Sequence, residues 1–175
     1  FTDATTLSFG LRYNYEEISA EVQDFAAGSV LAGDDDDSVW LGKLSLQHQL
    51  LEDTMVYGNV STGYKGQAFD TGIFTQEKAD NPVQPEESVN YELGVKSVFA
   101  DGRIQTNLAT FFTAYDDFQA QDVRVRENGS LAGQLLNVGK LETYGVELDA
   151  AALVVENLRL SLAMAYTHAE VAEWD

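Results

Sequence analysis

The stretch Leu7-Ser8-Phe9-Gly10-Leu11-Arg12-Tyr13-Asn14-Tyr15 decides the fold class of this 175-residue sequence. Every second residue is aliphatic or aromatic, and the residues between them are small or polar. Side chains of a β-strand point alternately to its two faces, so this period of two predicts a strand with one apolar and one polar face.

Six further segments show the same alternation, or are rich in β-branched and aromatic residues. We expect strands over residues 40–50, 55–64, 87–99, 103–118, 142–152 and 158–167. No segment has the convincing periodicity of an amphipathic helix. The sequence therefore predicts an all-β fold with about seven antiparallel, up-and-down strands.

The connections between these strands alternate between short and long. Short turns are expected at residues 51–53, 100–102 and 155–157, and Asp101-Gly102 is a hairpin signal in its own right. Long connections are expected at residues 18–38, 65–86 and 121–134. One end of the sheet would then carry tight turns and the other extended loops, as in outer-membrane β-barrels.

Composition and motifs argue against several classes of function. The 29 acidic and 10 basic residues give a net charge of -19, so nucleic acid is not an expected partner. No apolar run approaches the roughly 20 residues of a membrane-spanning helix. There is no Cys, no nucleotide-binding or catalytic motif, and His48 and His168 lack the partners of a metal site. We expect no enzyme, cofactor or metal site.

Alternating strands are compatible with either a soluble β-sandwich or a membrane barrel. The expected strands, roughly 11 to 17 residues long, exceed the about 5 to 6 of globular sheets and suffice to span a bilayer. Aromatic residues gather at strand ends beside the long connections, as in an interfacial girdle. They are Tyr13, Tyr15, Trp40, Tyr64, Tyr115, Phe118 and Tyr166. In a barrel, the charged residues at mid-strand would face the lumen: Arg12, Lys43, Glu92, Lys96, Glu147 and Arg159.

Four segments resemble, in the same order, the barrel of TonB-dependent receptors. Residues 56–66, VYGNVSTGYKG, followed by Ala68-Phe69-Asp70, resemble the family's Tyr-Ala-Ser-Val-Ser-x-Gly-Tyr/Phe-Lys and Gly-Gly-Phe-Asn pattern. Residues 84–96, QPEESVNYELGVK, are similar to its Pro-Glu-x-x-x-x-Tyr-Glu-x-Gly-x-Lys segment. The departures are small, with Gln67-Ala68 in place of the usual glycine pair and Asp70 in place of Asn.

The other two segments lie nearer the end of the chain. Residues 111–119, FFTAYDDFQ, resemble the family's Phe-x-x-x-Tyr-x-Asp-x-Gln strand end. Asn137-Val138-Gly139-Lys140, with Tyr144 to Glu147, is similar to its Asn-x-Gly-x-x-x-x-x-Gly-x-Glu hairpin. Together the four segments cover most of the chain from Trp40 onward.

The resemblance implies a large transmembrane β-barrel of which residues 1–175 form a part. About seven strands, an odd number, do not close a barrel of the bacterial type, so we expect the plug domain and the remaining strands to lie outside this sequence. Glycines such as Gly63, Gly94 and Gly145 would make room on the lumen face for close packing by other chain, such as the plug. Glu92, Lys96 and Glu147 would pair either with the plug or with neighbouring strands.

The resemblance also implies a function: a TonB-dependent receptor of the bacterial outer membrane that takes up a scarce nutrient, most often a ferric siderophore. Its partners would be the TonB energy-transducing complex acting through the plug, a small-molecule ligand such as a metal chelate, and outer-membrane lipid. Tyr64, Phe69 and Phe74 are the candidate ligand contacts, with packing within the loop as the alternative. The competing functions are a soluble β-sandwich for adhesion or binding, a passive porin and an outer-membrane enzyme.

The run Asp34 to Asp37 is expected in an external loop. Such a run is usually a solvated surface, and loose binding of a divalent cation by its carboxylates is the alternative.

Overall fold

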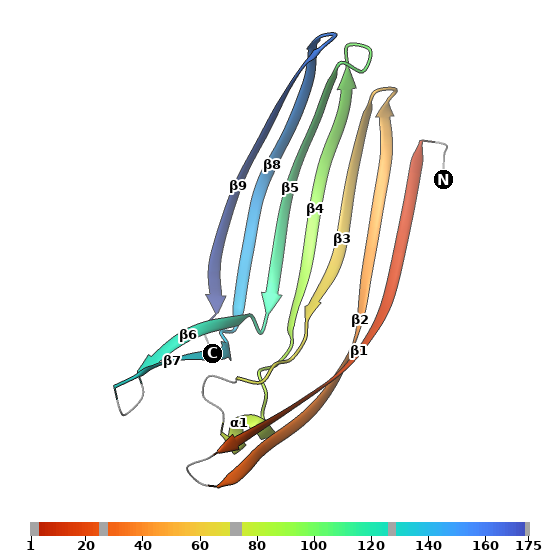
Figure 1. Ribbon diagram of the computed structural model, residues 1–175. Coiled ribbons are helices and arrows are strands. Elements are labelled where there is room, and N and C mark those ends of the chain that lie inside the picture. Colours follow the sequence, from red (N-terminus) through yellow and green to blue (C-terminus); the bar gives the residue numbers. More distant parts are fainter. Residues whose placement is uncertain (1–3, 25–27, 71–74, 126–128, 174–175) are drawn as a thin grey trace.

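The computed structural model describes residues 4–24, 28–70, 75–125 and 129–173. Seven long strands form one antiparallel sheet in the order β1-β2-β3-β4-β5-β8-β9, and β6 and β7 form a separate two-stranded hairpin (Figure 1). The strands of the sheet are β1 (Thr5–Asp24), β2 (Ser29–Leu51), β3 (Thr54–Lys65), β4 (Glu86–Phe99), β5 (Ile104–Asp116), β8 (Lys140–Val155) and β9 (Leu158–Glu173). The predicted all-β, up-and-down fold of about seven strands is confirmed.

Short turns and long connections lie at opposite ends of the sheet, as the sequence predicted (Figure 1). At the short-turn end, β2 passes into β3, β4 into β5 and β8 into β9 within a few residues. In the second turn the Arg103 N–H donates to the Ala100 carbonyl, and the two central residues, Asp101 and Gly102, adopt positive φ angles of 54° and 86°, the left-handed conformation that two-residue turns of hairpins need. The other end carries every longer excursion of the chain.

Three predictions about the long connections are wrong. The loop expected at residues 18–38 is mostly strand, because β1 continues to Asp24 and β2 already begins at Ser29. Asp34 to Asp37 therefore lie in strand β2 and not in a loop. The expected loop at residues 121–134 overlaps the hairpin of β6 (Gln119–Val125) and β7 (Leu131–Asn137). A short helix, α1 (Gln76–Asp80), lies in the connection between β3 and β4. At five residues, α1 is too short to show a helical period.

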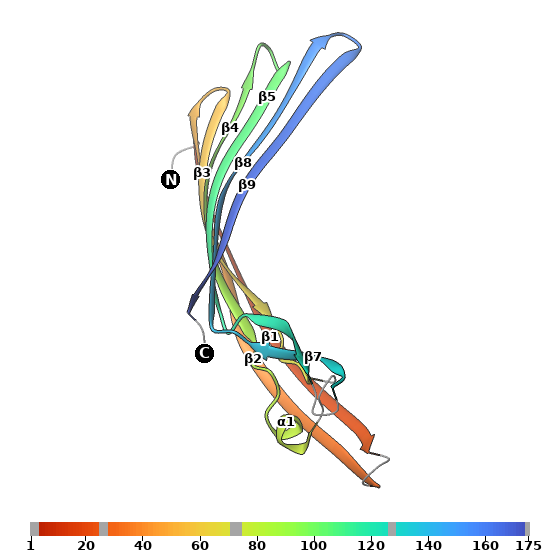
Figure 2. The same cartoon turned by 90° about the vertical axis from the view of Figure 1, so that its left-hand side faces the viewer.

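The main sheet has two faces, which we name after neighbouring residues of β1. The Leu11 face carries Leu7, Phe9, Leu11 and Tyr13, and the Arg12 face carries the intervening side chains. Seen from the side, the sheet is a single curved layer, with α1 and β6–β7 beside its loop end (Figure 2).

The described residues form no apolar core of the globular kind. In the described part of the chain, Ala79, Ala109 and Ala132 are the buried apolar residues, and no large side chain is fully buried. Leu158, Leu160 and Leu162 are 47%, 56% and 51% exposed, and they lie on an open face and not against a second sheet. This arrangement contradicts a β-sandwich, whose two sheets bury the apolar faces of their strands against each other.

No helix among the described residues is long and apolar enough to cross a membrane.

Candidate functional site: the Arg12 face and the loop end

The six charged residues predicted to face the lumen share one face of the sheet. Residues that are paired across neighbouring strands point to the same side, so the pairing register transfers the face from strand to strand. The pairing runs without interruption from Lys43 opposite Gly10 on β1 to Glu147 opposite Ala109 on β5. It places all six on the Arg12 face: Arg12, Lys43, Glu92, Lys96, Glu147 and Arg159.

Two of these charges are engaged by the neighbouring strand. Tyr57 of β3 is paired with Gly94 of β4, and a Cβ at Gly94 would overlap the Tyr57 ring. The Tyr57 side chain interacts with Glu92, and the Lys96 ammonium lies 5.3 Å from the ring centroid, within cation–π range. Of the two kinds of partner expected for Glu92 and Lys96, the structure therefore shows the neighbouring strand.

A second ring lies over a glycine further along the same face. A Cβ at Gly145 would lie 2.8 Å from two ring atoms of Phe111, its partner on β5, and would also overlap the backbone oxygen of Tyr166. The room at Gly94 and Gly145 is therefore occupied by rings of this chain. The sequence had suggested instead that these glycines leave room for a plug.

Within the described ranges, Lys43, Glu147 and Arg159 form no hydrogen bond or ion pair. Arg12 donates one hydrogen bond, of 3.2 Å, to Asn14 on its own strand.

The Leu11 face changes from apolar to acidic along the β1–β2 pair. The two strands pair continuously from Thr5 opposite His48 to Asp24 opposite Ser29, so the same face continues to the tip. After Tyr15 this face carries Glu17 and Glu21, and on β2 it carries Asp34 and Asp36. The apolar residues Ile18, Ala20 and Val22 now lie on the Arg12 face.

The apolar part of the Leu11 face has the height of a bilayer band. Tyr15 lies eight positions after Leu7, and eight steps of about 3.3 Å, tilted by about 40°, span roughly 20 Å. At its upper limit, the rings of Tyr13 and Trp40 contact each other with centroids 5.0 Å apart. Amphipathic rings at this level are typical of a membrane interface, because one edge meets water and the body meets lipid.

Beyond this limit the Arg12 face is covered by other parts of the chain. Helix α1 packs on β2 so closely that a Cβ at Gly33 would overlap the backbone of Ala79, which is 1% exposed. The Gln76 side chain donates a hydrogen bond of 3.0 Å to the carbonyl of Ala32. The Thr75 side chain caps the helix by accepting from the backbone N–H of Lys78.

Two carboxylates converge on the hydroxyl of Tyr64. This hydroxyl lies 2.9 Å from Glu16 Oε1 and 2.8 Å from Asp37 Oδ2, and the backbone N–H of Gln67 donates to the same Glu16 oxygen at 3.1 Å. Burial, hydrogen bonds to both carboxylates and their negative charge raise the pKa of Tyr64 far above its ordinary value of 10.0. Tyr64 therefore keeps its proton and joins the end of β3 to the β1–β2 pair.

The four aspartates from Asp34 to Asp37 do not face one site. Because they follow one another in a strand, Asp35 and Asp37 lie on the Arg12 face, whereas Asp34 and Asp36 lie on the Leu11 face. Within the described residues, no group of three or more His, Cys, Asp or Glu side chains is placed to hold a metal ion. Cation binding by this run has no geometric support in the described structure.

The three candidate ligand contacts are placed unevenly. Tyr64 is part-buried and engaged with Glu16 and Asp37, and Phe69 is part-buried in the segment that follows β3. Phe74 lies outside the described residues. The structure thus brings Tyr64 and Phe69 to the loop end of the sheet.

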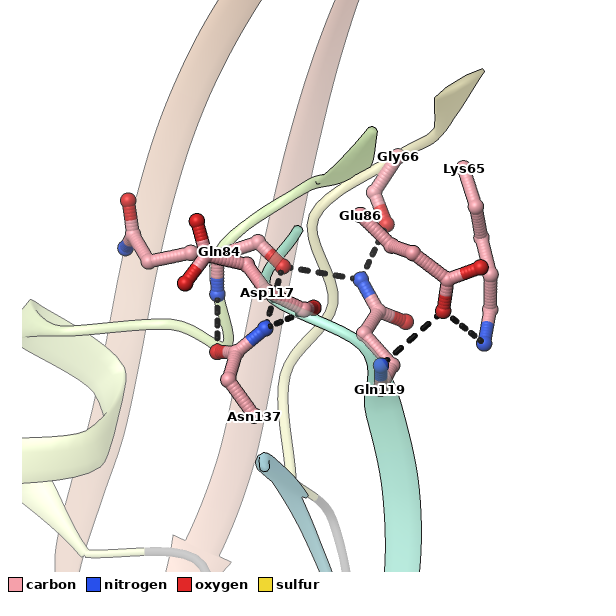
Figure 3. Close-up of polar contacts among 7 residues, drawn as sticks. All are labelled: Lys65, Gly66, Gln84, Glu86, Asp117, Gln119 and Asn137. Carbon is pink, nitrogen blue, oxygen red and sulfur yellow. Dashed lines mark hydrogen bonds and ion pairs between the residues drawn. The ribbon is translucent and has the colours of Figure 1, made fainter. Parts of the chain in front are cut away.

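Residues from all four family-like segments meet at this end, although they are far apart in sequence (Figure 3). The Gln119 side chain, in a residue that is 6% exposed, donates hydrogen bonds to the carbonyls of Gly66 at 2.8 Å and Gln84 at 2.9 Å. Its backbone N–H donates to Glu86 Oε2 at 2.9 Å, and Glu86 lies 3.8 Å from the Lys65 ammonium.

Asn137 completes this cluster from the end of β7. Its side-chain amide donates to the carbonyls of Gln84 at 3.0 Å and Asp117 at 2.7 Å, and its oxygen accepts from the backbone N–H of Gln84 at 2.9 Å (Figure 3). The backbone N–H and the backbone C=O of Gln84 are therefore both hydrogen-bonded by side chains of other elements. We call Gly66, Gln84, Glu86, Gln119 and Asn137 the amide cluster.

The amide cluster was missed as a site by sequence reasoning. Each of its members lies within or beside a segment that carried the family resemblance, and that was the available signal. The segments were interpreted as strand ends and hairpins, and no sequence pattern stated that they meet. Long-range hydrogen bonds between side chains and carbonyl groups depend on how loops return to the sheet, which periodicity does not encode.

A groove of about 220 Å³ lies beside the amide cluster. One wall is formed by the segment around α1 and the other by β7. An ion pair between Lys78 and Asp70 lies in the first wall, and the Asp70 side chain is 5% exposed. The lining residues are Asp70, Lys78, Asn81, Pro82, Val83, Gln134, Leu135, Leu136 and Asn137.

Comparison with known proteins gives a consistent result. A family model described as "TonB dependent receptor-like, beta-barrel" matches residues 1–175. The pesticin receptor of Yersinia pestis is 32% identical over 151 residues, which are 85% of this chain and 21% of that receptor. The ferric-pyoverdine M114 receptor PbuA of Pseudomonas sp. (strain M114) is 29% identical over 108 residues, which are 59% of this chain and 13% of that receptor.

Among solved structures, the ferric yersiniabactin uptake receptor FyuA from Yersinia pestis matches with a TM-score of 0.78 at 27% sequence identity. The match covers 97% of this chain and 25% of that receptor. The chain thus corresponds to a minor part of the length of each of these receptors.

Proposed function

The chain belongs to the TonB-dependent receptor β-barrel family of the bacterial outer membrane, and from this premise we propose that its parent protein takes up a ferric siderophore. One observation carries the proposal. The whole chain matches the family's barrel, and its relatives at 27–32% identity include receptors named for pesticin, ferric pyoverdine and ferric yersiniabactin. The family consists of transport receptors and not enzymes.

In this proposal the chain supplies part of the barrel wall. The Leu11 face meets lipid between Leu7 and Tyr15, and the Arg12 face lines the lumen. A plug domain elsewhere in the parent protein fills that lumen and receives energy from the TonB complex. Arg12, Lys43, Glu147 and Arg159 are the side chains that would meet the plug, because Glu92 and Lys96 already contact Tyr57.

Ligand recognition is assigned to the loop end. Tyr64 and Phe69 lie there, and Phe74 belongs to the same connection between β3 and β4. Aromatic side chains offer large contact areas at a low cost in conformational entropy. The net charge of -19 does not attract anionic chelates over long distances, so the ligand would be held by contacts and not by electrostatic steering.

Uptake by energised and de-energised cells tests this function. Cells that lack the parent gene are complemented with the wild-type receptor or with Phe69→Ala, and are supplied with radioactive iron bound to a panel of siderophores. We expect saturable uptake of at least one chelate that disappears without TonB, and weaker binding by Phe69→Ala. Val123→Ala, an exposed position on β6, serves as the control.

Non-saturable uptake that persists without TonB would instead identify a passive porin. Absence of uptake for every iron chelate, together with TonB-dependent uptake of another metal complex, would keep the receptor and overturn the iron assignment.

A further inference from the structure

At the loop end, strand β2, helix α1 and the β6–β7 hairpin are connected one after another by specific contacts. The first joint holds α1 against β2. It consists of the close packing of Ala79 on Gly33 and the hydrogen bond from Gln76 to the carbonyl of Ala32. The glycine is required there, because any side chain would push into the helix backbone. A side chain introduced at position 33 would therefore push α1 away from β2.

The path from α1 to the amide cluster is short and stiff. Only residues 81–83 separate the end of α1 from Gln84. Pro82 has a fixed φ, and Val83 exchanges two backbone hydrogen bonds of 3.1 and 2.9 Å with Ala68. A displacement of α1 therefore reaches Gln84 without passing through a flexible linker.

The last joint holds Gln84 against the β6–β7 hairpin. The Gln84 carbonyl accepts from Gln119 at the start of β6 and from Asn137 at the end of β7, and the Gln84 N–H donates to Asn137. These bonds contact both strands of the hairpin at its base. Because Gln119 is almost fully buried, water does not readily replace its hydrogen bonds.

We propose that the amide cluster couples the β6–β7 hairpin to α1, so that both walls of the groove move as one unit. Gln119 and Asn137 are then positioning residues: they fix the distance between the α1 segment and β7. The coupling is a property of this chain's own contacts and does not depend on which ligand the receptor takes up. In this proposal the four family-like segments together form the connection between α1 and the hairpin, which no single segment provides.

A two-site perturbation in the full-length receptor, read by hydrogen exchange, tests the coupling. Gly33→Val displaces α1, and exchange is measured separately in residues 76–80 and in β6–β7. With the amide cluster intact, we expect exchange to become about tenfold faster in both regions. In a background with Gln119→Met and Asn137→Asp, Gly33→Val should accelerate exchange in residues 76–80 alone. Gln121→Met, an exposed amide on the same hairpin, provides the matched background control and should leave the transmission intact.

Two results would overturn the proposal. One is no effect of Gly33→Val on β6–β7 when the cluster is intact. The other is an equal effect on β6–β7 with and without the cluster, which would show that α1 and the hairpin communicate by another route. Exchange in residues 76–80 that is unchanged by Gly33→Val would refute the first joint and the proposal with it. If Gly33→Val prevents barrel folding, Gly33→Ala places a smaller group at the same contact and takes its place.

Discussion

We call the half of the β1–β2 pair at the short-turn end, around Leu7 to Tyr15, the lower half, and the half at the loop end the upper half, although Figure 1 draws the loop end at the bottom. The two halves share one uninterrupted register and differ in which face is apolar. In the lower half, from Leu7 to Tyr15, the apolar side chains lie on the Leu11 face and are about half to three-quarters exposed. In the upper half, the same face carries Glu17, Glu21, Asp34 and Asp36, and the apolar side chains of β1 (Ile18, Ala20 and Val22) have moved to the Arg12 face. Backbone pairing is the same in both halves, so pairing cannot be the cause of the reversal.

The reversal indicates a change of environment along the strands. A face that exposes Leu, Phe and Tyr without cover requires an apolar solvent, and a face that exposes consecutive carboxylates requires water. In the upper half, α1 of the same chain packs on the Arg12 face at Gly33, and Ile18, Ala20 and Val22 on that face are part-buried, whereas the Leu11 face of the lower half has no such cover among the described residues. We infer that the membrane boundary lies at the level of Tyr13, Trp40 and Tyr15.

The largest expected effect comes from placing a charge on the Leu11 face in each half. Leu11→Arg lies at the middle of the apolar band, and we expect it to destabilise the folded receptor in lipid vesicles by about 2–4 kcal/mol. Ser19→Arg lies on the same face in the upper half, where the charge stays in water, and should change stability by less than about 0.5 kcal/mol. Urea unfolding of both variants measures the difference. Equal destabilisation would remove the distinction between the halves.

An intermediate effect is expected on the Arg12 face within the membrane. Gly145→Val would collide with the Phe111 ring and the backbone of β9, and should destabilise the receptor by about 1–3 kcal/mol in the same unfolding experiment. Gly10→Val is the matched control, because nothing lies within 4 Å of a Cβ built at Gly10. A stable Gly145→Val protein would show that the rings do not need their glycines.

The smallest effect concerns pH and is confined to the upper half. The folded-state pKa of Tyr64 is raised above the unfolded value of 10.0, so its contribution to stability is complete below pH 10 and is lost as the pH rises above it. Hydrogen exchange in residues 16–22 and 30–37 should accelerate above pH 10 after correction for the intrinsic dependence of exchange on pH. Exchange in residues 7–13 should not. Tyr64→Phe should abolish this additional alkaline acceleration. If the acceleration persists in Tyr64→Phe, other groups are responsible.

Much of the sheet could be predicted because its signals are local. Alternation identified the strands, and turn residues such as Asp101-Gly102 located the short connections. The upper halves of β1 and β2 were missed for a physical reason. After Tyr15 the apolar residues change face, and the run Asp34 to Asp37 has no alternation at all, so the period of two is lost where the solvent changes. The strands continue there because their backbones pair with each other.

The candidate site was only partly predictable, because its geometry depends on distant segments. That Arg12, Lys43, Glu92, Lys96, Glu147 and Arg159 share a face followed from alternation in each strand and a correct register. The amide cluster did not follow, because Gln119 and Asn137 bind carbonyl groups more than thirty residues away. The partnership of Lys96 and Glu92 with Tyr57 likewise required the pairing of β3 with β4.

One measurement tests the membrane boundary most directly. Single cysteines at residues 7, 9, 11, 13, 15, 17, 19 and 21 of the full-length receptor in lipid vesicles are spin-labelled, and collisions with dissolved oxygen are compared with collisions with a water-soluble nickel complex. We expect oxygen to dominate from residue 7 to residue 13 and nickel to dominate from residue 17 to residue 21, with the change at residue 15. A uniform ratio along these positions, or nickel access at residues 9 and 11, would contradict the assignment of the Leu11 face to lipid.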